Sequence, residues 1–453
     1  MNDVQNLDGN IKLNSLSEKI FDSLSDEEII QFIEKECDRT HLDISTLIFA
    51  FEHNKSTKVI MKMIEMGGHQ LITSKNQDGL TVLHCTCKYK APTDVILKII
   101  ELGGEKLVLE EEHEGCTVLH IAYDSKPSTE VIMKLLEVGG KELVMKKNKF
   151  GYTALHYACM NEDSAEVSIM KMIELGGQEL IMEKNEFGST ALHCACNHKA
   201  CTDSVIMKMI ELGGRQLIME KNTLGSTALH WACKCKSRTK VIMKMIELGG
   251  RQLVMEKDLV CLRTALHIAC INEAPIEAIM KLVDTGGHQT VIAKDKFGKT
   301  ALHYACWKKA SIEVIIMLVI VGGRQLVMEK NKCGYTALNY VSQSHPSNKG
   351  DIMLERVSST NSDEKIKEIV KSTVEAMTIA QQHSFIHTAV KCGLKWSITK
   401  ELVVSSNVDE AVNGHDRLTG LRLFMISAME NDGISHDLDS IYGFMRMSPF
   451  VKA

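Results

Sequence analysis

Residues 188–222 read GSTALHCACNHKACTDSVIMKMIELGGRQLIMEKN, and this stretch decides the fold because it recurs along the chain. The repeating unit is 36 or 37 residues long and follows the pattern G-x-T-A-L-H-x-A-C, a variable polar stretch, V-I-M-K-M-I-E-L-G-G and R-Q-L-I-M-E-K-N. Eight glycine doublets mark the successive units, and they begin at Gly67, Gly103, Gly139, Gly176, Gly213, Gly249, Gly286 and Gly322. The 453-residue chain is therefore predicted to be a repeat array and not one conventional core.

Each unit is predicted to contain two helices. Thr190 can cap a short helix through its hydroxyl, and the small and apolar residues that follow suit close packing against neighbours. The second run, 205–211, has apolar pairs four residues apart, with Lys208 and Glu211 left for solvent. Thr202 and Asp203 are candidate caps for this longer, outer helix.

The glycine doublet is expected to end the outer helix. Gly213 and Gly214 supply the positive φ that a helix C-terminus needs. The segment from there to the next glycine, Gly225, is predicted to be a projecting loop or hairpin, which we call a finger. Most of the additional length of the unit is expected in this finger.

The motif T-A-L-H-x-A-C, followed by a helix that ends in Gly-Gly, resembles the ankyrin motif T-P-L-H-x-A-A followed by a helix and G-A-D. The resemblance covers residues 45–341. It implies an all-α solenoid of stacked helix-turn-helix units with projecting loops or short β-hairpin fingers. Two departures predict irregular geometry, since Leu262 replaces a turn glycine and Asn339 replaces the repeat histidine.

The ends of the array differ from its middle, and four segments are predicted. Residues 1–40 form a helical cap or extension, in which Ser25 and Glu28 make a capping box, and residues 41–341 form the array with a degenerate first unit. Residues 342–384 are a polar break and a helix, and residues 385–453 are degenerate ankyrin-like units with a closing cap. An alternative for the N-terminal helices is an F-box-like adaptor of a ubiquitin ligase, although the segment lacks the expected proline and length.

Composition favours a soluble intracellular protein. The net charge is -5, with acidic and basic residues interspersed, so no basic stripe is available for nucleic acid. The chain starts without a signal peptide and has no run of about 18 apolar residues, so neither export nor a membrane contact is expected. The fifteen cysteines are interpreted as reduced thiols in the cytoplasm, with the nucleus as an alternative.

A recurring His-x-x-Cys pair is the pattern that most resembles a metal site. It occurs at His84/Cys87, His156/Cys159, His193/Cys196, His230/Cys233, His267/Cys270 and His303/Cys306. The histidine occupies the position of the ankyrin histidine, which bonds neighbouring loops, and the cysteine that of a tightly packed alanine. No metal, cofactor or small-molecule substrate is therefore expected, and the absence of a phosphate loop or nucleophile motif argues against an enzyme.

The resemblance implies a protein partner bound at the finger tips and inner helices. The candidate tip residues are Phe150, Phe187, Leu224 and Phe297, and the other variable positions hold Tyr89, Tyr152, Arg263, Trp307 and Tyr335. Only 5% of the chain is aromatic, so this enrichment favours binding anchors. The alternative is that each phenylalanine folds onto the adjacent finger.

Overall fold

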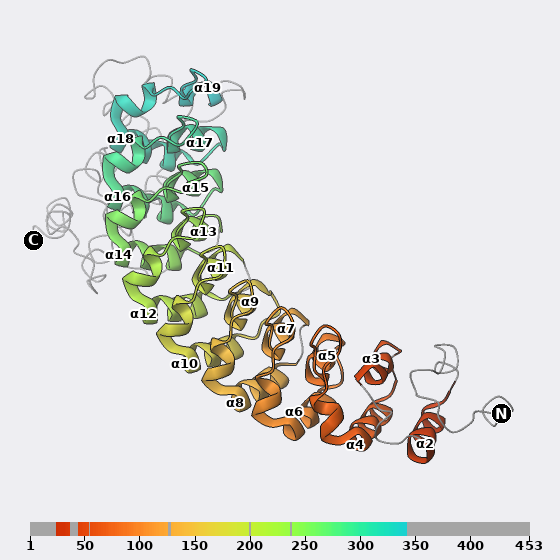
Figure 1. Ribbon diagram of the computed structural model, residues 1–453. Helices are drawn as coiled ribbons and strands as arrows, with labels where there is room; N and C mark the ends of the chain where they lie inside the picture. Colours follow the sequence, from red (N-terminus) through yellow and green to blue (C-terminus); the bar gives the residue numbers. More distant parts are fainter. Residues whose placement is uncertain are drawn as a thin grey trace, which may run out of the picture. The chain divides into compact units, whose positions relative to one another are not determined.

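The computed structural model describes residues 24–36, 44–53, 55–125, 128–198, 201–235 and 238–341 (Figure 1). The segments predicted at 342–384 and 385–453 lie outside the described residues, as does the part of the N-terminal extension before residue 24. The chain divides into two compact units, with the boundary between Leu212 and Gly213. Each unit is considered by itself.

The first unit is built from pairs of one short and one long helix. Its helices are α2 (Asp26–Glu36), α3 (Ile44–Glu52), α4 (Thr57–Thr73), α5 (Val82–Lys88), α6 (Thr93–Val108), α7 (Val118–Ser125), α8 (Thr129–Met145), α9 (Ala154–Met160), α10 (Glu166–Met182) and α11 (Ala191–Asn197). The long helices α4, α6, α8 and α10 pack in sequence order, and so do the short helices from α3 to α11. This is the stacking expected of units that each expose two apolar faces.

The second unit repeats the arrangement. Helix α12 (Asp203–Met219) spans the boundary, and it is followed by α13 (Ala228–Ala232), α14 (Thr239–Met255), α15 (Ala265–Ile271), α16 (Ile276–Ile292), α17 (Ala301–Trp307), α18 (Ile312–Met328) and α19 (Ala337–Val341). The long helices α14, α16 and α18 pack together, as do the short helices α13, α15, α17 and α19. The described chain is thus an all-α ankyrin-type stack within each unit. We call the odd-numbered helices from α3 to α19 inner helices and the even-numbered helices from α4 to α18 outer helices.

The segment after the glycine doublet was predicted to belong to the finger, and this prediction is wrong. Each outer helix continues for another helical turn beyond a kink at the second glycine, which in α12 is Gly214 with φ 53° and ψ −148°. The reason is burial, because Leu217 and Ile218 of this turn are completely enclosed. Most of the additional length therefore lies in a helical turn, and the fingers stay short.

The two glycines of a doublet are required for different reasons. The second has a backbone conformation that side chains disfavour, with φ near +50° to +63° in every described outer helix from α4 to α18. The first is helical, but a Cβ at Gly213 would lie 2.5 Å from Leu217 Cβ. The doublet thus folds the additional turn back against its own helix.

The predicted caps are present. Thr190 and His193 form a reciprocal capping box at the start of α11, with Thr190 Oγ1 2.9 Å from His193 Nδ1. Thr202 Oγ1 accepts a hydrogen bond from the Val205 amide at the start of α12. In α19 the substituted Asn339 preserves the cap, because its Oδ1 accepts from the Thr336 amide at 2.7 Å.

Three turns between inner and outer helices lack the glycine of the ankyrin pattern and still use its conformation. Lys90, Glu273 and Lys309 have φ of 54° or 55° at equivalent positions. After Lys90, the Ala91 amide donates to the Thr86 carbonyl at 2.9 Å, which is the long hydrogen bond of a Schellman motif. This bond holds residues other than glycine in the left-handed region.

Helix α2 begins with a capping box and packs against the first outer helix, α4. The Ser25 amide donates to Glu28 Oε2 at 2.8 Å, which confirms the capping box, and this bond lowers the pKa of Glu28. Ile29 and Ile33 are buried, and α2 packs against α4. No helix among the described residues is long and apolar enough to cross a membrane.

Candidate protein-binding surface

Each finger is a tight turn organised by one polar side chain at its base. In the finger that precedes α11, Asn185 Oδ1 accepts hydrogen bonds from the amides of Phe187 and Ser189 at 3.0 and 2.9 Å. The corresponding residue makes the same pair of bonds in other fingers, where it is Asn76, Glu112, Asn148, Asn222, Asp295 or Asn331. A short antiparallel bridge such as Lys184 to Thr190 closes the finger. The finger tip is therefore fixed by local chemistry.

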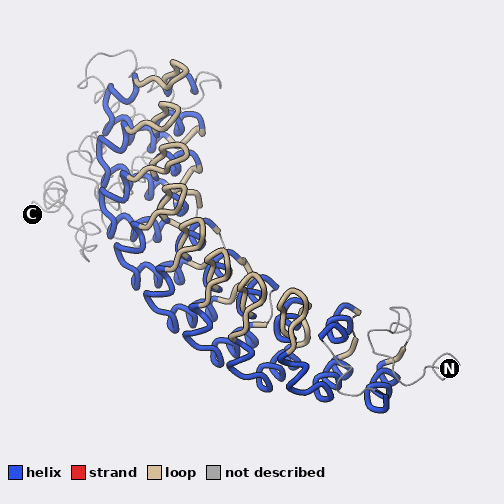
Figure 2. The backbone as a smooth tube through the Cα atoms, in the orientation of Figure 1, coloured by secondary structure: helices blue, strands red, loops and turns tan. Residues whose placement is uncertain are grey.

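The fingers follow one another as loops along each unit (Figure 2), and backbone hydrogen bonds join neighbouring ones. The Phe150 carbonyl accepts from the Glu186 amide at 2.9 Å in the first unit. In the second unit, the Leu224 carbonyl accepts from the Leu259 amide at 2.8 Å and the Phe297 carbonyl from the Lys332 amide at 3.0 Å. The tips are thus ordered before any partner arrives, which reduces the entropy cost of binding.

The repeat histidine links the inner helix to the next finger, as predicted. His156 Nδ1 bonds the hydroxyl of Thr153 at 2.9 Å, and its Nε2 lies 3.0 Å from the Ser189 carbonyl of the following finger. His120, His267 and His303 use both ring nitrogens in the same way. An imidazole with both nitrogens engaged has no free nitrogen for a metal ion.

Burial shifts the pKa values of the repeat histidines and cysteines toward their neutral forms. It lowers the pKa of His84, His120, His156 and His267 to about 4, so these rings are neutral at pH 7. It raises the pKa of Cys85, Cys87, Cys194 and Cys270 to about 12, which suppresses the reactive thiolate. Among the described residues, no cluster of three or more His, Cys, Asp and Glu side chains is placed to hold a metal ion.

The four predicted tip residues lie at the finger tips and are about half exposed. The exposed fraction is 44% for Phe150, 53% for Phe187, 47% for Leu224 and 47% for Phe297. Phe187 also contacts the adjacent finger, because its ring centroid lies 6.5 Å from that of Tyr152 in an edge-on arrangement. About half of each tip side chain is therefore held against the protein, and the other half is exposed apolar surface.

The other predicted aromatic residues differ in how much surface they offer. Trp307 and Tyr335 are each 51% exposed, at the end of α17 and on the last described finger. Tyr152 is half-buried among His156, Tyr157 and Phe187. Tyr89 is half-buried as well, with its hydroxyl donating to Glu52 Oε1 at 3.0 Å.

Arg263 is engaged inside the scaffold. Its Nη2 donates to the Tyr304 hydroxyl at 3.0 Å, and the Tyr304 hydroxyl donates to Asp295 Oδ2 at 2.6 Å. Arg263 Nε lies 3.7 Å from the same carboxylate oxygen, and the Asp295 side chain is fully buried. The guanidinium therefore neutralises the buried Asp295 carboxylate. Because it is engaged there, Arg263 is expected to contribute less to direct contact with a partner.

Sequence reasoning missed three exposed aliphatic residues on the finger with the substituted glycine. Leu259, Val260 and Leu262 are 70%, 51% and 43% exposed. Leu262 has a φ of 56°, in the left-handed region where the other described fingers have a glycine. The replaced glycine and the additional residue in D-L-V-C-L-R were the available signal. We call this finger, residues 258–263, the aliphatic finger.

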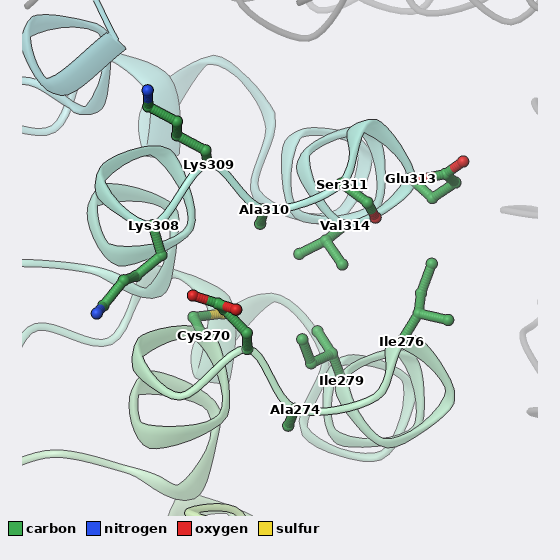
Figure 3. A pocket seen from close by; sticks show the side chains of 11 residues that line it. Cys270, Ala274, Ile276, Ile279, Lys308, Lys309, Ala310, Ser311, Glu313 and Val314 are labelled. Atoms are coloured by element: carbon green, nitrogen blue, oxygen red, sulfur yellow. The ribbon is translucent and has the colours of Figure 1, made fainter. Parts of the chain in front are cut away.

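A separate pocket of about 490 Å³ lies between two inter-helix turns of the second unit (Figure 3). Ile276, Ile279 and Val314 form its apolar wall, and Lys308 and Lys309 extend from the turn after α17. Fingers lead into the N-terminal ends of inner helices, whereas this pocket lies at their C-terminal ends. It is therefore distinct from the finger surface.

The family model for ankyrin repeats in many copies matches residues 282–341, which contain α17 and α18. The same unit recurs along the described chain, with a capping Thr–His pair at each inner helix from α5 to α17. Residues 282–341 thus match ankyrin repeats, and the recurrence of their unit supports an ankyrin-repeat protein. Such repeats indicate a protein-interaction scaffold. No curated protein matches the chain by sequence.

Three solved structures show how far the similarity extends. The ankyrin repeat domain of Bcl-3, from the IkappaB protein family, is 20% identical with a TM-score of 0.38, covering 62% of this chain and 100% of that chain. The ankyrin repeat domain of human ASB11 is 18% identical with a TM-score of 0.41, covering 54% and 99%. A chain from the complex of the predatory endopeptidase Bd0816 of Bdellovibrio bacteriovorus with the immunity protein Bd3460 is 19% identical with a TM-score of 0.36, covering 46% and 98%.

Proposed function

We propose that the protein is a non-catalytic scaffold that holds a protein partner on its finger tips and inner helices. The observation that carries this proposal is the set of half-exposed apolar side chains at equivalent finger positions, on fingers that are bonded to their neighbours within each unit. Water-exposed Phe and Leu side chains on a rigid backbone suit hot-spot contacts. The proposed anchors are Phe150, Phe187, Leu224, Phe297, Trp307 and Tyr335, with Tyr89, Tyr152 and Arg263 as supporting contacts.

The experiment that tests this function compares two variants of the full chain. One carries Phe150→Ala, Phe187→Ala, Leu224→Ala and Phe297→Ala. The control carries Leu102→Ala and Val167→Ala, which remove exposed but smaller apolar side chains from the outer helices α6 and α10. Each is used to capture partners from the native cell, with quantitative mass spectrometry as the readout.

We expect the tip variant to lose specific partners and the control to retain them. Removal of an interface anchor typically weakens binding by about 1–2 kcal/mol or more. Equal circular dichroism spectra and unfolding temperatures would show that both variants are folded. Undiminished capture by the folded tip variant would contradict a finger-tip site.

The N-terminal adaptor alternative gains no support from α2. Its apolar residues Ile29 and Ile33 are buried in the contact with α4, so they are used in covering the stack. Deletion of residues 1–40 tests whether this segment binds a second partner.

A further inference from the structure

Two fingers of the second unit carry an exposed lysine at the position before the tip. These are Lys296 and Lys332, on the fingers that carry Phe297 and Tyr335. In the first unit Lys149 holds the same position, but its Nζ lies 3.8 Å from Glu114 Oε1. The second unit thus places basic side chains directly beside exposed apolar ones.

These lysines have no carboxylate partner among the described residues. The acidic residues at the bases of neighbouring fingers are already paired, Glu256 with Lys221 at 2.5 Å and Glu329 with Lys294 at 2.5 Å. Asp295 is buried beneath Arg263. The positive charge of Lys296 and Lys332 is therefore available to an incoming group.

A third lysine is held in place by aromatic rings. Lys299 Nζ lies 5.3 Å from the ring centroid of Tyr304, 5.8 Å from that of Trp307 and 5.0 Å from that of Tyr340. Cation–π contacts fix the ammonium without neutralising its charge. Lys299 is thus oriented between the fingers and α17, where its ammonium can still donate to a carboxylate.

The aliphatic finger supplies the apolar part of the same surface. Leu259, Val260 and Leu262 are exposed. Leu262 has a φ of 56°, whereas the seven other described fingers have a glycine at this position, with φ of 66° to 83°. A leucine in this conformation is strained, and strain of this kind is concentrated at functional sites. The finger therefore presents a side chain where glycine would fold more easily.

From these observations we infer that the fingers at residues 258–335 bind an acidic segment of a protein partner that also carries apolar side chains. This inference rests on the proposed scaffold function and specifies its partner. The aliphatic finger and Phe297 receive the apolar side chains, and Lys296, Lys299 and Lys332 face the carboxylates. Exposed aliphatic side chains favour a protein segment over nucleic acid, whose recognition relies on stacking and phosphate contacts.

The test uses the purified full chain and a displayed library of random 12-residue peptides. The enriched peptides are expected to be acidic and to contain Leu, Ile or Phe. A fluorescein-labelled copy of the most enriched peptide is then titrated by fluorescence anisotropy against the wild type and against variants. We expect binding to weaken as salt is raised, because the attraction is between exposed charges.

Three variants make the titration specific. Lys296→Glu with Lys332→Glu is expected to weaken binding by about tenfold or more. Leu262→Gly is expected to weaken it by about fivefold through loss of apolar contact. The matched control Lys240→Glu with Lys244→Glu makes the same change of net charge on the outer helix α14, and it should alter binding less than about twofold.

Neutral or basic enriched peptides, equal weakening by the control, or the absence of any enriched peptide would overturn the inference. Preferential binding of a labelled 20-mer of thymidine, lost in the Lys296→Glu/Lys332→Glu variant, would overturn it in favour of nucleic acid. Acidic peptides could fail to bind while partner capture still depends on Phe150, Phe187, Leu224 and Phe297. In that case the scaffold function stands and only the acidic-segment inference is wrong. If capture is also independent of those residues, the scaffold proposal itself fails.

Discussion

Tyr157 in the first unit and Tyr304 in the second both follow the repeat histidine, yet their hydroxyls have different partners. The Tyr157 hydroxyl accepts from Asn148 Nδ2 at 3.1 Å, which is a neutral bond. The Tyr304 hydroxyl donates to the carboxylate of Asp295 and accepts from Arg263. One asparagine-to-aspartate change at the finger base is thus accommodated by an arginine from the preceding finger. The two units therefore share the scaffold geometry at this position, while the charge at the finger base differs between them.

The largest expected effect is acid destabilisation through the buried histidines. Their folded pKa of about 4 lies below the ordinary value of 6.5, so the unfolded state binds the proton first. The contribution of these neutral histidines to the free energy of unfolding is fully present above pH 6.5. It is lost as the pH falls toward 4, by about 3 kcal/mol per histidine. Thermal unfolding of the full chain at pH 7, 6 and 5 measures this loss. An unfolding temperature that stays constant over this range would contradict it.

The next effect tests whether the two units share one scaffold. Gly177 and Gly250 have nearly the same backbone conformation, with φ of 57° and 59°, and a Cβ at either would meet no atom within 4 Å. Replacing either with alanine should therefore cost only backbone strain, about 1–3 kcal/mol. Urea unfolding of Gly177→Ala and Gly250→Ala should give equal losses. A clear inequality would show that the doublets are not equivalent.

The difference between the tyrosines can be measured directly. Tyr304→Phe removes a bond to a buried carboxylate and should lower the free energy of unfolding by about 2 kcal/mol. Tyr157→Phe removes only a neutral bond from Asn148 and should cost about 1 kcal/mol. Combining Tyr304→Phe with Asp295→Asn should recover part of the loss, as measured by denaturant unfolding. Equal costs for the two single variants would refute the contrast between the units.

The smallest effect concerns the aliphatic finger. Leu262→Gly relieves a left-handed residue but adds freedom to the unfolded chain, so it should raise stability by about 0.5 kcal/mol. The reverse change in the first unit, Gly188→Leu, should lower it by about 1–2 kcal/mol. Differential scanning calorimetry detects both shifts. Destabilisation by Leu262→Gly would mean that Leu262 is retained for packing.

Much of this architecture could be predicted from the repeat itself. The Thr–His cap, the paired helices and the structural histidine follow from residue types at fixed spacing, because capping and helical periodicity act within a few residues. Even the N-terminal capping box of Ser25 was readable. The family resemblance likewise indicated where a partner could bind.

Other features were decided only by tertiary structure. The turn at 215–219 became helical because Leu217 and Ile218 find a buried environment that no local pattern describes. Arg263 could be identified as a scaffold residue only once Asp295 and Tyr304 from the next repeat lay beside it. The repeat, its caps and the glycine-marked helix ends can be read from the sequence alone, since these depend on neighbours along the chain. Which side chains remain available to a partner depended on contacts between repeats, because burial and charge pairing are set by residues that are distant in sequence.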